Sequence, residues 1–384
     1  MRLLIAGGGT GGHIYPALAV ARSLRDRPNA PELVWLGGHR GLEASLVRGA
    51  GIRVRRLVLR SLRTVDVSVH AVLDPIRLAA SVPQAAAILA RERPAAIFTT
   101  GGYVAVPTLM AAAPLRIPVV LWDGNVVPGR AVRLTARFAD AIAVSHEATG
   151  LALAGSHTSW FLTGTPIRDV AAIGRDEARV RLELPADARV MLIFGGSQAV
   201  RRFNAAVGAA LPRLVETGHV LHVTGDEGYP AALAARERLP VDLRPRYRPH
   251  PFLRDEMLPA LVAADLVVGR AGSSTIAEVT ALGIPSVIVP YPHAAGHQTA
   301  NARVLAETGG ARLVADEAFD AAALEEAAAL LADPAALAAM SAAARALGRP
   351  GAADAVAELV MAAAQRRPLP DKATIDRLSR RVGA

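Results

Sequence analysis

Short apolar runs that end in glycine recur along the chain, with helical patterns between them. The first run is Leu3 to Ala6, which leads into Gly7 to Gly12 and then into a helix from about Tyr15 to Arg25. Strand, glycine turn and helix in this order predict βαβ units built on a parallel sheet. Further strands are expected at residues 33–36, 95–100, 119–122 and 141–144, with a half-buried strand at 51–59, where apolar residues alternate with Arg.

The alternation of strands and helices is interrupted at Phe161 to Pro166, where Gly and Pro cluster. This interruption predicts a crossing between two domains. Strands are expected again at 190–194, 220–224, 244–247, 266–268 and 286–289, and helices at 204–215 and 273–282. Residues 320–347 read as helical with a break at Asp333-Pro334, a last helix covers 351–366, and the tail from Pro368 is polar.

The predicted fold class is α/β, with two Rossmann-like domains facing each other across a ligand cleft. We expect the first domain at 1–163 and the second at 164–345. A C-terminal helix at 346–366 is expected to pack back on the first domain, ahead of a polar tail at 367–384.

Residues 67–91 carry more apolar residues at helical spacing than one buried face needs, and Pro75 and Pro83 are expected to break the helix. Two interpretations stay open for this stretch, packing in the core and contact with a membrane surface.

Composition favours folded domains, because 52% of the 384 residues are hydrophobic and the mean hydropathy is +0.30. The absence of cysteine excludes disulfides and thiolate metal sites. No uninterrupted apolar stretch reaches about 18 residues, so no membrane-spanning helix is expected. The opening residues MRLLIA are too short for a secretory signal. We therefore expect a cytoplasmic protein that at most touches a membrane surface.

The net charge is +9, and Lys372 is the only lysine among 43 basic residues. Seven arginines lie between Arg40 and Arg63, against the single acid Glu43. Such a patch suits an anionic partner (phosphate, an acidic membrane or nucleic acid), and a solvated face is the alternative. With 4% aromatic residues and no basic stripe that carries stacking residues, nucleic-acid binding is disfavoured.

The first glycine loop formally matches GxGxxG at Gly7, Gly9 and Gly12, so a dinucleotide site is one interpretation. The second strand ends in Gly37-Gly38-His39-Arg40 rather than in an acid, which leaves only an NADP site that uses Arg40. Gly11 and His13 fit better with a loop that lets a phosphorylated ligand approach the backbone closely.

Residues 264–301 form a second candidate site. A strand at 266–268 runs into Gly269 to Gly272, and a helix then opens with Ser273, Ser274 and Thr275. The N-terminus of such a helix binds anions, and Glu278 lies about one turn further on, where it can face a polyol. No Asp-x-Asp occurs in the chain, so we expect diphosphate charge to be met by amides, helix N-termini and arginine at 195–197 and 270–275.

Four motifs together resemble the MurG family, glycosyltransferase family 28: GGGTGGH at 7–13, TGGYVAVP at 100–107, GGSQAVRRFN at 195–204 and RAGSSTIAEVTALGIPSVIVPYPHAAGHQTANA at 270–302. The resemblance covers about residues 1–360. It implies a GT-B fold and transfer of N-acetylglucosamine from UDP-GlcNAc to the MurNAc 4-hydroxyl of lipid I, an undecaprenyl-diphosphate glycolipid. The transfer inverts the anomeric carbon, gives lipid II for peptidoglycan synthesis, and uses no metal or cofactor. The family also implies peripheral attachment to the anionic cytoplasmic face of the cell membrane.

The resemblance also implies roles for individual residues. Glu278 would accept both ribose hydroxyls, Leu253 would pack on the uracil, and Gln298 would hold the sugar hydroxyls. The other donor positions are Thr10, Gly11, Gly12, Asn125, Arg168, Ser197, Ser273, Ser274, Thr275, Ile276 and Ala277. The acceptor diphosphate would lie against Gly9, Gly102 and Tyr103.

The attacking hydroxyl needs a general base, for which His13 and Asp123 are both candidates. The family usually has His-Glu-Gln-Asn where this chain has Trp122-Asp123-Gly124-Asn125, so the acid is kept but shortened. His13 could instead donate a hydrogen bond to a phosphate.

Three other activities stay in view. The first is a related GT-B transferase with another lipid acceptor, such as diacylglycerol. The second is a UDP-sugar 2-epimerase, which would need more acids and histidines than the chain offers. The third is an NADPH-binding oxidoreductase.

Overall fold

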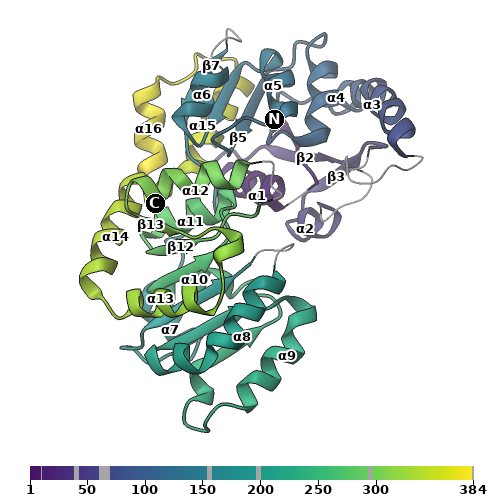
Figure 1. Ribbon diagram of the computed structural model, residues 1–384. Helices are drawn as coiled ribbons and strands as arrows, with labels where there is room; N and C mark the ends of the chain where they lie inside the picture. The colour runs from purple at the N-terminus through teal and green to yellow at the C-terminus, as the bar shows by residue number, and fades with distance from the viewer. Residues whose placement is uncertain are drawn as a thin grey trace. The chain divides into compact units, whose positions relative to one another are not determined.

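A computed structural model describes residues 1–9, 11–38, 43–59, 70–153, 158–195, 200–292 and 296–382. The chain divides into two compact units (Figure 1). Unit 1 comprises Met1–Arg168 together with Arg349–Val382, and unit 2 comprises Asp169–Gly348. The chain thus leaves unit 1 after Arg168 and returns to it at Arg349.

Unit 1 is built on a seven-stranded parallel sheet in the order β3-β2-β1-β4-β5-β6-β7. The strand order reverses between β1 and β4, and ligands bind at such a switch point in open α/β sheets. The strands are β1 (Arg2–Ala6), β2 (Glu32–Gly37), β3 (Arg53–Arg56), β4 (Ala96–Thr99), β5 (Val119–Asp123), β6 (Ala141–Val144) and β7 (Ser159–Leu162).

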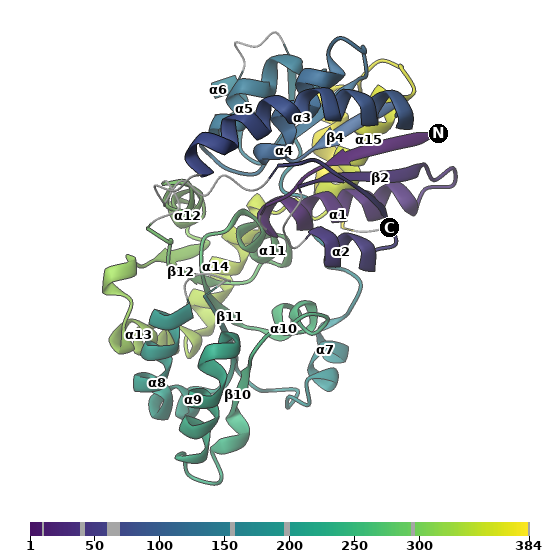
Figure 2. The same cartoon turned by 90° about the vertical axis from the view of Figure 1, so that its right-hand side faces the viewer.

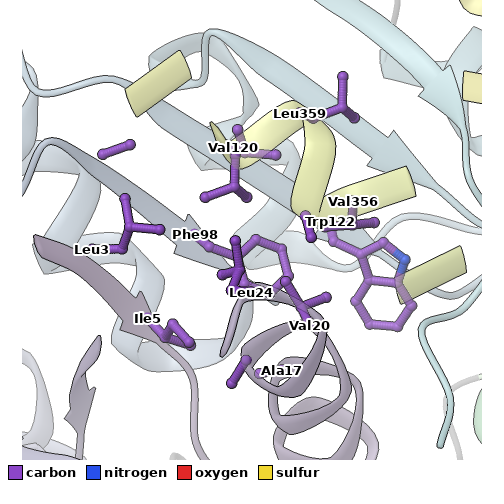
Figure 3. Close-up of a cluster of buried hydrophobic side chains, with 14 of the residues drawn as sticks. Leu3, Ile5, Ala17, Val20, Leu24, Phe98, Val120, Trp122, Val356 and Leu359 are labelled. Carbon is purple, nitrogen blue, oxygen red and sulfur yellow. The ribbon is translucent and has the colours of Figure 1, made fainter. Parts of the chain in front are cut away.

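Helices cover both faces of this sheet, so the strands are apolar almost throughout. Leu3 and Ile5 of β1 point to one face, which α1 and α15 cover, and Figure 3 shows this cluster with Trp122 and Val356. Leu4 and Ala6 point to the other face and pack with residues of α3 and α4. Figure 2 shows these two helices beside each other. The helices are α1 (Gly11–Arg25), α2 (Glu43–Gly49), α3 (His70–Glu92), α4 (Gly102–Ala112), α5 (Arg130–Thr135), α6 (Glu147–Leu153), α15 (Ala352–Ala364) and α16 (Lys372–Arg380), with a 3-10 turn η1 (Ala136–Phe138).

Unit 2 repeats the plan with a six-stranded parallel sheet in the order β10-β9-β8-β11-β12-β13, which reverses between β8 and β11. Its strands are β8 (Val190–Phe194), β9 (His219–Val223), β10 (Tyr247–His250), β11 (Leu266–Gly269), β12 (Ser286–Ile288) and β13 (Ala311–Leu313).

The helices of unit 2 also cover both faces, with α8 and α13 on one face and α10 and α11 on the other. Their bounds are α7 (Arg175–Arg181), α8 (Val200–Thr217), α9 (Gly225–Glu237), α10 (Met257–Ala263), α11 (Ser273–Leu282), α12 (His297–Glu307), α13 (Ala321–Leu331) and α14 (Pro334–Leu347), with 3-10 turns η3 (Arg244–Arg246) and η4 (Asp316–Ala318).

Several predicted elements differ from the observed ones. The predicted crossing at 161–166 includes the end of β7, because Phe161 is buried in the sheet as a seventh strand. The strand expected at 244–247 begins only at Tyr247, after a 3-10 turn. Pro75 and Pro83 do not break α3, which runs through both. The polar tail contains α16, where Asp371 caps the helix and Ile375 is fully buried.

Within the described ranges, no single helix has the length and apolar character needed to cross a membrane. One bent pair, Ala321–Leu331 with Pro334–Ala364, passes that test by length and composition alone. Leu324 and Val356, which lie in these helices, are buried in the cores of units 2 and 1.

Candidate functional site

The loop after β1 lies at the switch point of unit 1, and its first glycine packs closely against the end of β4. The indole N–H of Trp35 donates to the Gly7 carbonyl at 2.9 Å. A Cβ atom on Gly7 would lie 3.0 Å from the Thr100 hydroxyl, closer than ordinary contact. Glycine at this position therefore lets the loop after β1 meet the end of β4 directly.

His13, in the first turn of α1, is tied to Thr100 at the end of β4. Its Nδ1 lies 2.7 Å from the Thr100 carbonyl oxygen, and the Thr100 hydroxyl donates to the His13 carbonyl at 3.0 Å. Because a carbonyl only accepts, Nδ1 must carry the proton, so Nε2 of the neutral ring is an acceptor. Burial lowers the pKa of His13, against the raising effects of the Thr100 carbonyl and Asp123. The ring is therefore a neutral base at pH 7.

The Nε2 side of this ring faces Gly102 at the start of α4. A Cβ on Gly102 would lie 3.6 Å from His13 Cδ2 and 3.7 Å from Nε2, and Gly102 has a φ of +73°. Tyr103 follows, and its hydroxyl lies so close to Gly38 that a Cβ there would collide with it. The structure thus brings His13 and Gly102 together, as the predicted acceptor side requires.

Asp123 ends β5, and its carboxylate is used by its own loop. Oδ1 accepts from the backbone N–H of Asn125 at 3.0 Å and from its side-chain amide at 3.2 Å, while Oδ2 accepts from the Gly129 N–H at 3.3 Å. Burial raises the pKa of Asp123, and these hydrogen bonds oppose that effect. Each carboxylate oxygen accepts at least one N–H of residues 125–129, so the carboxylate of Asp123 stabilises the loop that carries Asn125.

Helix α11 carries most of the predicted donor positions in unit 2. It begins after Gly272 with no side-chain cap within the described residues, so its first N–H groups are available to an anion. Glu278 is only 9% exposed and stands beyond the half-buried Ser273, Ser274 and Thr275, while Ile276 is buried and Ala277 half-buried. The helix ends at Gly283 in the left-handed conformation.

The other predicted donor residues lie on several elements and differ in how exposed they are. Gln298 lies in the first turn of α12, and its Oε1 accepts from the Tyr291 N–H at 2.9 Å. Leu253 is 9% exposed and packs in the core of unit 2, whereas its neighbour Phe252 is 54% exposed. Arg168 is half-buried at the end of unit 1, and Gly11 and Gly12 open α1. Thr10 and Ser197 lie outside the described residues.

Arg270, which was expected to help meet diphosphate charge, is paired with protein groups of unit 2. Its guanidinium pairs with Asp316 at 2.6 Å and donates to the Val289 and Pro290 carbonyls. The pairing joins residues 46 positions apart, which no local pattern in the sequence reveals.

Sequence reasoning assigned no role to Thr100 or Tyr291, although each contacts a predicted site residue. A hydroxyl residue directly before Gly101-Gly102 at the end of a strand was a usable signal for Thr100. Tyr291 had no such signal, because its contact is made by its backbone.

Comparison with known proteins accounts for both units. The N-terminal domain of glycosyltransferase family 28 matches residues 3–144, and the C-terminal domain of that family matches residues 190–358. The UDP-N-acetylglucosamine--N-acetylmuramyl-(pentapeptide) pyrophosphoryl-undecaprenol N-acetylglucosamine transferase of Desulforudis audaxviator is 38% identical over 368 residues, which cover 94% of this chain and 98% of the relative.

Solved structures agree with this match. The crystal structure of MurG from Acinetobacter baumannii superposes with a TM-score of 0.73 at 27% identity and covers 94% of this chain and 99% of its own. A UDP-GlcNAc 2-epimerase from Neisseria meningitidis reaches a TM-score of 0.64 at 13% identity, covering 92% and 98%, which shows a shared fold alone. The predicted α/β GT-B fold is confirmed, and the chain belongs to the MurG family of glycosyltransferase family 28.

Proposed function

We infer that this chain transfers N-acetylglucosamine from UDP-GlcNAc to the MurNAc 4-hydroxyl of lipid I and so forms lipid II. The relative at 38% identity carries this reaction in its name, and the match extends over nearly the whole of both chains. The observation that carries the chemistry is His13, a neutral histidine at the switch point of unit 1 with Nε2 as its acceptor.

In the proposed reaction the acceptor oxygen attacks C1 of the donor sugar while the bond from C1 to the UDP oxygen breaks. Attack from the side opposite to UDP inverts the anomeric carbon. His13 Nε2 takes the proton from the attacking hydroxyl, and the electron pair of the broken bond leaves on UDP.

His13 is a better candidate for the base than Asp123, because every Asp123 oxygen already accepts from an N–H group of its own loop. Protonating Asp123 would weaken those hydrogen bonds, because a neutral carboxyl is a poorer acceptor than a carboxylate. Asp123 therefore acts through Asn125 in this proposal, by fixing the loop that carries it.

The donor side of the proposal uses α11. Its N-terminal amides, with Ser273, Ser274 and Thr275, meet the diphosphate charge, and Ser197 also contacts the phosphates in this proposal. Glu278 accepts the two ribose hydroxyls, which suits a carboxylate held almost wholly out of water. The backbone at Leu253 reads the uracil, since the side chain itself is committed to the core.

The acceptor diphosphate is proposed to lie against Gly9, Gly102 and Tyr103. Gly9 and Gly102 both have positive φ values, of 100° and 73°, which turn the backbone at these two loops. Successive amides in such turns form concavities that bind anions.

Attachment to an anionic membrane is proposed for the outer surface of α3, α4 and α5, three neighbouring helices on one face of the sheet. Ile76, Met110 and Leu134 are 60%, 46% and 49% exposed there. Arg130, Arg133 and Arg137 are exposed along α5 and its continuation. Exposed apolar side chains beside arginines are typical of surfaces that bind acidic lipid.

The arginine patch at 40–63 contributes less than its sequence suggests. Arg53 and Arg55 both pair with the buried Glu92, at 2.9 and 2.6 Å, which offsets part of their charge. Arg40, Arg60 and Arg63 lie outside the described residues.

Release of UDP from UDP-GlcNAc in the presence of a short-chain lipid I analogue tests the proposed reaction. Release with diacylglycerol and none with the lipid I analogue would contradict the proposed reaction.

Sedimentation with vesicles of anionic or zwitterionic lipid tests the proposed membrane-binding surface of α3, α4 and α5. Replacing Ile76, Met110 and Leu134 together by Ser should abolish binding to anionic vesicles, and Val241→Ser, at a 76% exposed position of unit 2, should not.

A further inference from the structure

Arg270 in unit 2 is a buried cation, which is unusual in a protein core. It directly follows β11, is 6% exposed, and pairs with Asp316 at 2.6 Å. Its guanidinium lies 4.8 Å from the centre of the Phe203 ring and 5.5 Å from that of Tyr291. Taking a cation out of water costs several kcal/mol unless its geometry and hydrogen bonds are good. An apolar side chain would fill the same space without this desolvation cost.

The contacts of Arg270 converge on the segment that follows β12. Its Nη1 group donates to the Val289 carbonyl at 3.2 Å and to the Pro290 carbonyl at 3.3 Å. The side chain therefore ties the end of β11, where α11 is about to begin, to the point where the chain leaves β12.

The same segment holds Gln298. The Tyr291 N–H donates to Gln298 Oε1 at 2.9 Å. This N–H and the Pro290 carbonyl belong to one peptide group, which is planar and rigid. Arg270 thus binds one side of that peptide and Gln298 binds the other, so a rotation of the peptide would break both contacts. Hydrogen bonds on both sides of one peptide also polarise and strengthen each other.

We propose that Arg270 is a positioning residue for recognition of the donor sugar. It fixes the Pro290–Tyr291 peptide, which in turn fixes the amide of Gln298. With Oε1 committed to Tyr291, the amide nitrogen of Gln298 is the group that meets a sugar hydroxyl, and it does so as a donor. This inference rests on the proposed function, in which Gln298 contacts the sugar.

We expect arginine to be required at position 270, because the orientation of the Pro290–Tyr291 peptide depends on the shape of this side chain as well as on its charge. One terminal nitrogen, Nη1, donates to a carboxylate and two carbonyls, while the flat guanidinium lies near two aromatic rings. Lysine would keep the charge and a donor nitrogen but lacks the flat faces. Arg270→Lys is therefore the informative variant, since it separates geometry from charge.

The test measures binding of three ligands to the full chain by calorimetry: UDP, UDP-GlcNAc and UDP-GalNAc, the C4 epimer of the donor. We expect Arg270→Lys to lower the preference for UDP-GlcNAc over UDP-GalNAc about tenfold, because a small displacement of a polar group weakens discrimination by this order. Affinity for UDP, which does not reach Gln298, should stay unchanged.

Arg202→Gln is the matched control. Arg202 pairs with the other oxygen of Asp316 at 3.3 Å and is 46% exposed, so the variant removes an arginine from the same cluster without touching the peptide. It should keep the wild-type preference. Asp316→Asn, which removes the anchor of Arg270, should lower the preference as Arg270→Lys does.

Loss of UDP affinity in Arg270→Lys in proportion to the loss of UDP-GlcNAc affinity would overturn the inference, because it would indicate a general structural role. An unchanged preference with intact UDP binding would also overturn it. Neither result bears on the proposed function, which the lipid I assay tests separately in the wild-type chain. A wild-type chain that bound both sugar nucleotides equally would overturn this inference together with the assignment of the donor.

Discussion

His13 and Thr100 hold each other through two reciprocal hydrogen bonds, each from a side chain to the other residue's backbone carbonyl. The distances are 2.7 Å from His13 Nδ1 to the Thr100 oxygen and 3.0 Å from Thr100 Oγ1 to the His13 oxygen. The pair joins α1 to the end of β4 across the switch point of unit 1. The tautomer of the ring, and hence its use as a base through Nε2, follows from this pairing.

Replacing His13 by Gln should lower kcat by about 10²- to 10⁴-fold, the usual contribution of a positioned general base. Gln can keep a hydrogen bond to the Thr100 carbonyl but cannot take up a proton. Affinity for UDP, measured by calorimetry, should not change, because His13 makes none of the contacts proposed for the nucleotide. A variant that lost UDP affinity but kept its kcat would assign His13 to binding instead.

The pH profile of turnover provides an independent check on His13. The base works only when unprotonated, and burial lowers its pKa from 6.5. Turnover should therefore be constant through neutral pH and fall as the pH drops through a value below 6.5. A profile whose acidic limb lies above that value would indicate another base, or a His13 exposed to water.

Gly102→Ala should destabilise the protein and lower turnover. At a φ of +73° an added Cβ costs roughly 1–2 kcal/mol, and it would fill the space between the Gly8 carbonyl and the His13 ring at distances of 3.4 to 3.7 Å. Gly208→Ala is the matched control, since Gly208 lies inside α8 with open space around it. That change should stabilise the protein by about 0.5–1 kcal/mol. Urea unfolding of both variants measures the difference, and equal effects would contradict the assigned strain.

The regular parts of the fold were predictable because strand, glycine loop and helix each have a local signature. The helix at 273–282 and the break at Asp333-Pro334 match the structure, since a hydroxyl-rich start, a terminal glycine and a proline are visible in the sequence. The helix at 372–380 was missed because its segment is short and mostly polar, although Asp371 caps it and Ile375 and Leu378 pack against the core of unit 1.

Arginine was the least predictable residue, because its partners are distant in the sequence. Arg244, Arg246 and Arg248 alternate through a single short segment, yet each donates to carbonyls where a different helix ends. Arg248 reaches Glu183 after α7, and Arg246 reaches Val215 near the end of α8. The sequence alone does not show that these arginines, or Arg270, donate to groups of the protein itself, so it cannot tell them from arginines that bind a ligand.

Glu278→Gln should weaken UDP binding by roughly tenfold or more, since a hydrogen bond from a hydroxyl to a carboxylate contributes about 1.5–3 kcal/mol. The change keeps the size of the side chain and removes one of its two acceptor oxygens. The variant should also bind 2′-deoxy-UDP and UDP with similar affinity, because its lost contact is to the ribose. Glu326→Gln, at an exposed position on α13, serves as control and should match wild type. An unchanged Kd for UDP in Glu278→Gln would remove Glu278 from the site.

Stability should decline as the pH falls below neutrality, because the buried His222 and the half-buried His146 stay neutral in the fold. Burial lowers the pKa of His146 to about 4 and that of His222 to about 3. An unfolded chain takes up these protons near pH 6.5, so the free energy of unfolding falls by up to about 1.4 kcal/mol per pH unit for each group between that pH and the folded-state value.

His222 allows this slope to be tested at one position. It is 1% exposed, and its Nδ1 lies 2.9 Å from the Tyr247 hydroxyl. His222→Gln can keep a hydrogen bond to Tyr247 but cannot titrate, so its urea-unfolding free energy should depend less steeply on pH over the acidic range than that of wild type. Tyr247→Phe removes the hydroxyl and leaves the buried ring, so it should lower stability without changing the slope. Equal slopes in wild type and His222→Gln would show that the imidazole is protonated within the folded protein, in contradiction to its burial.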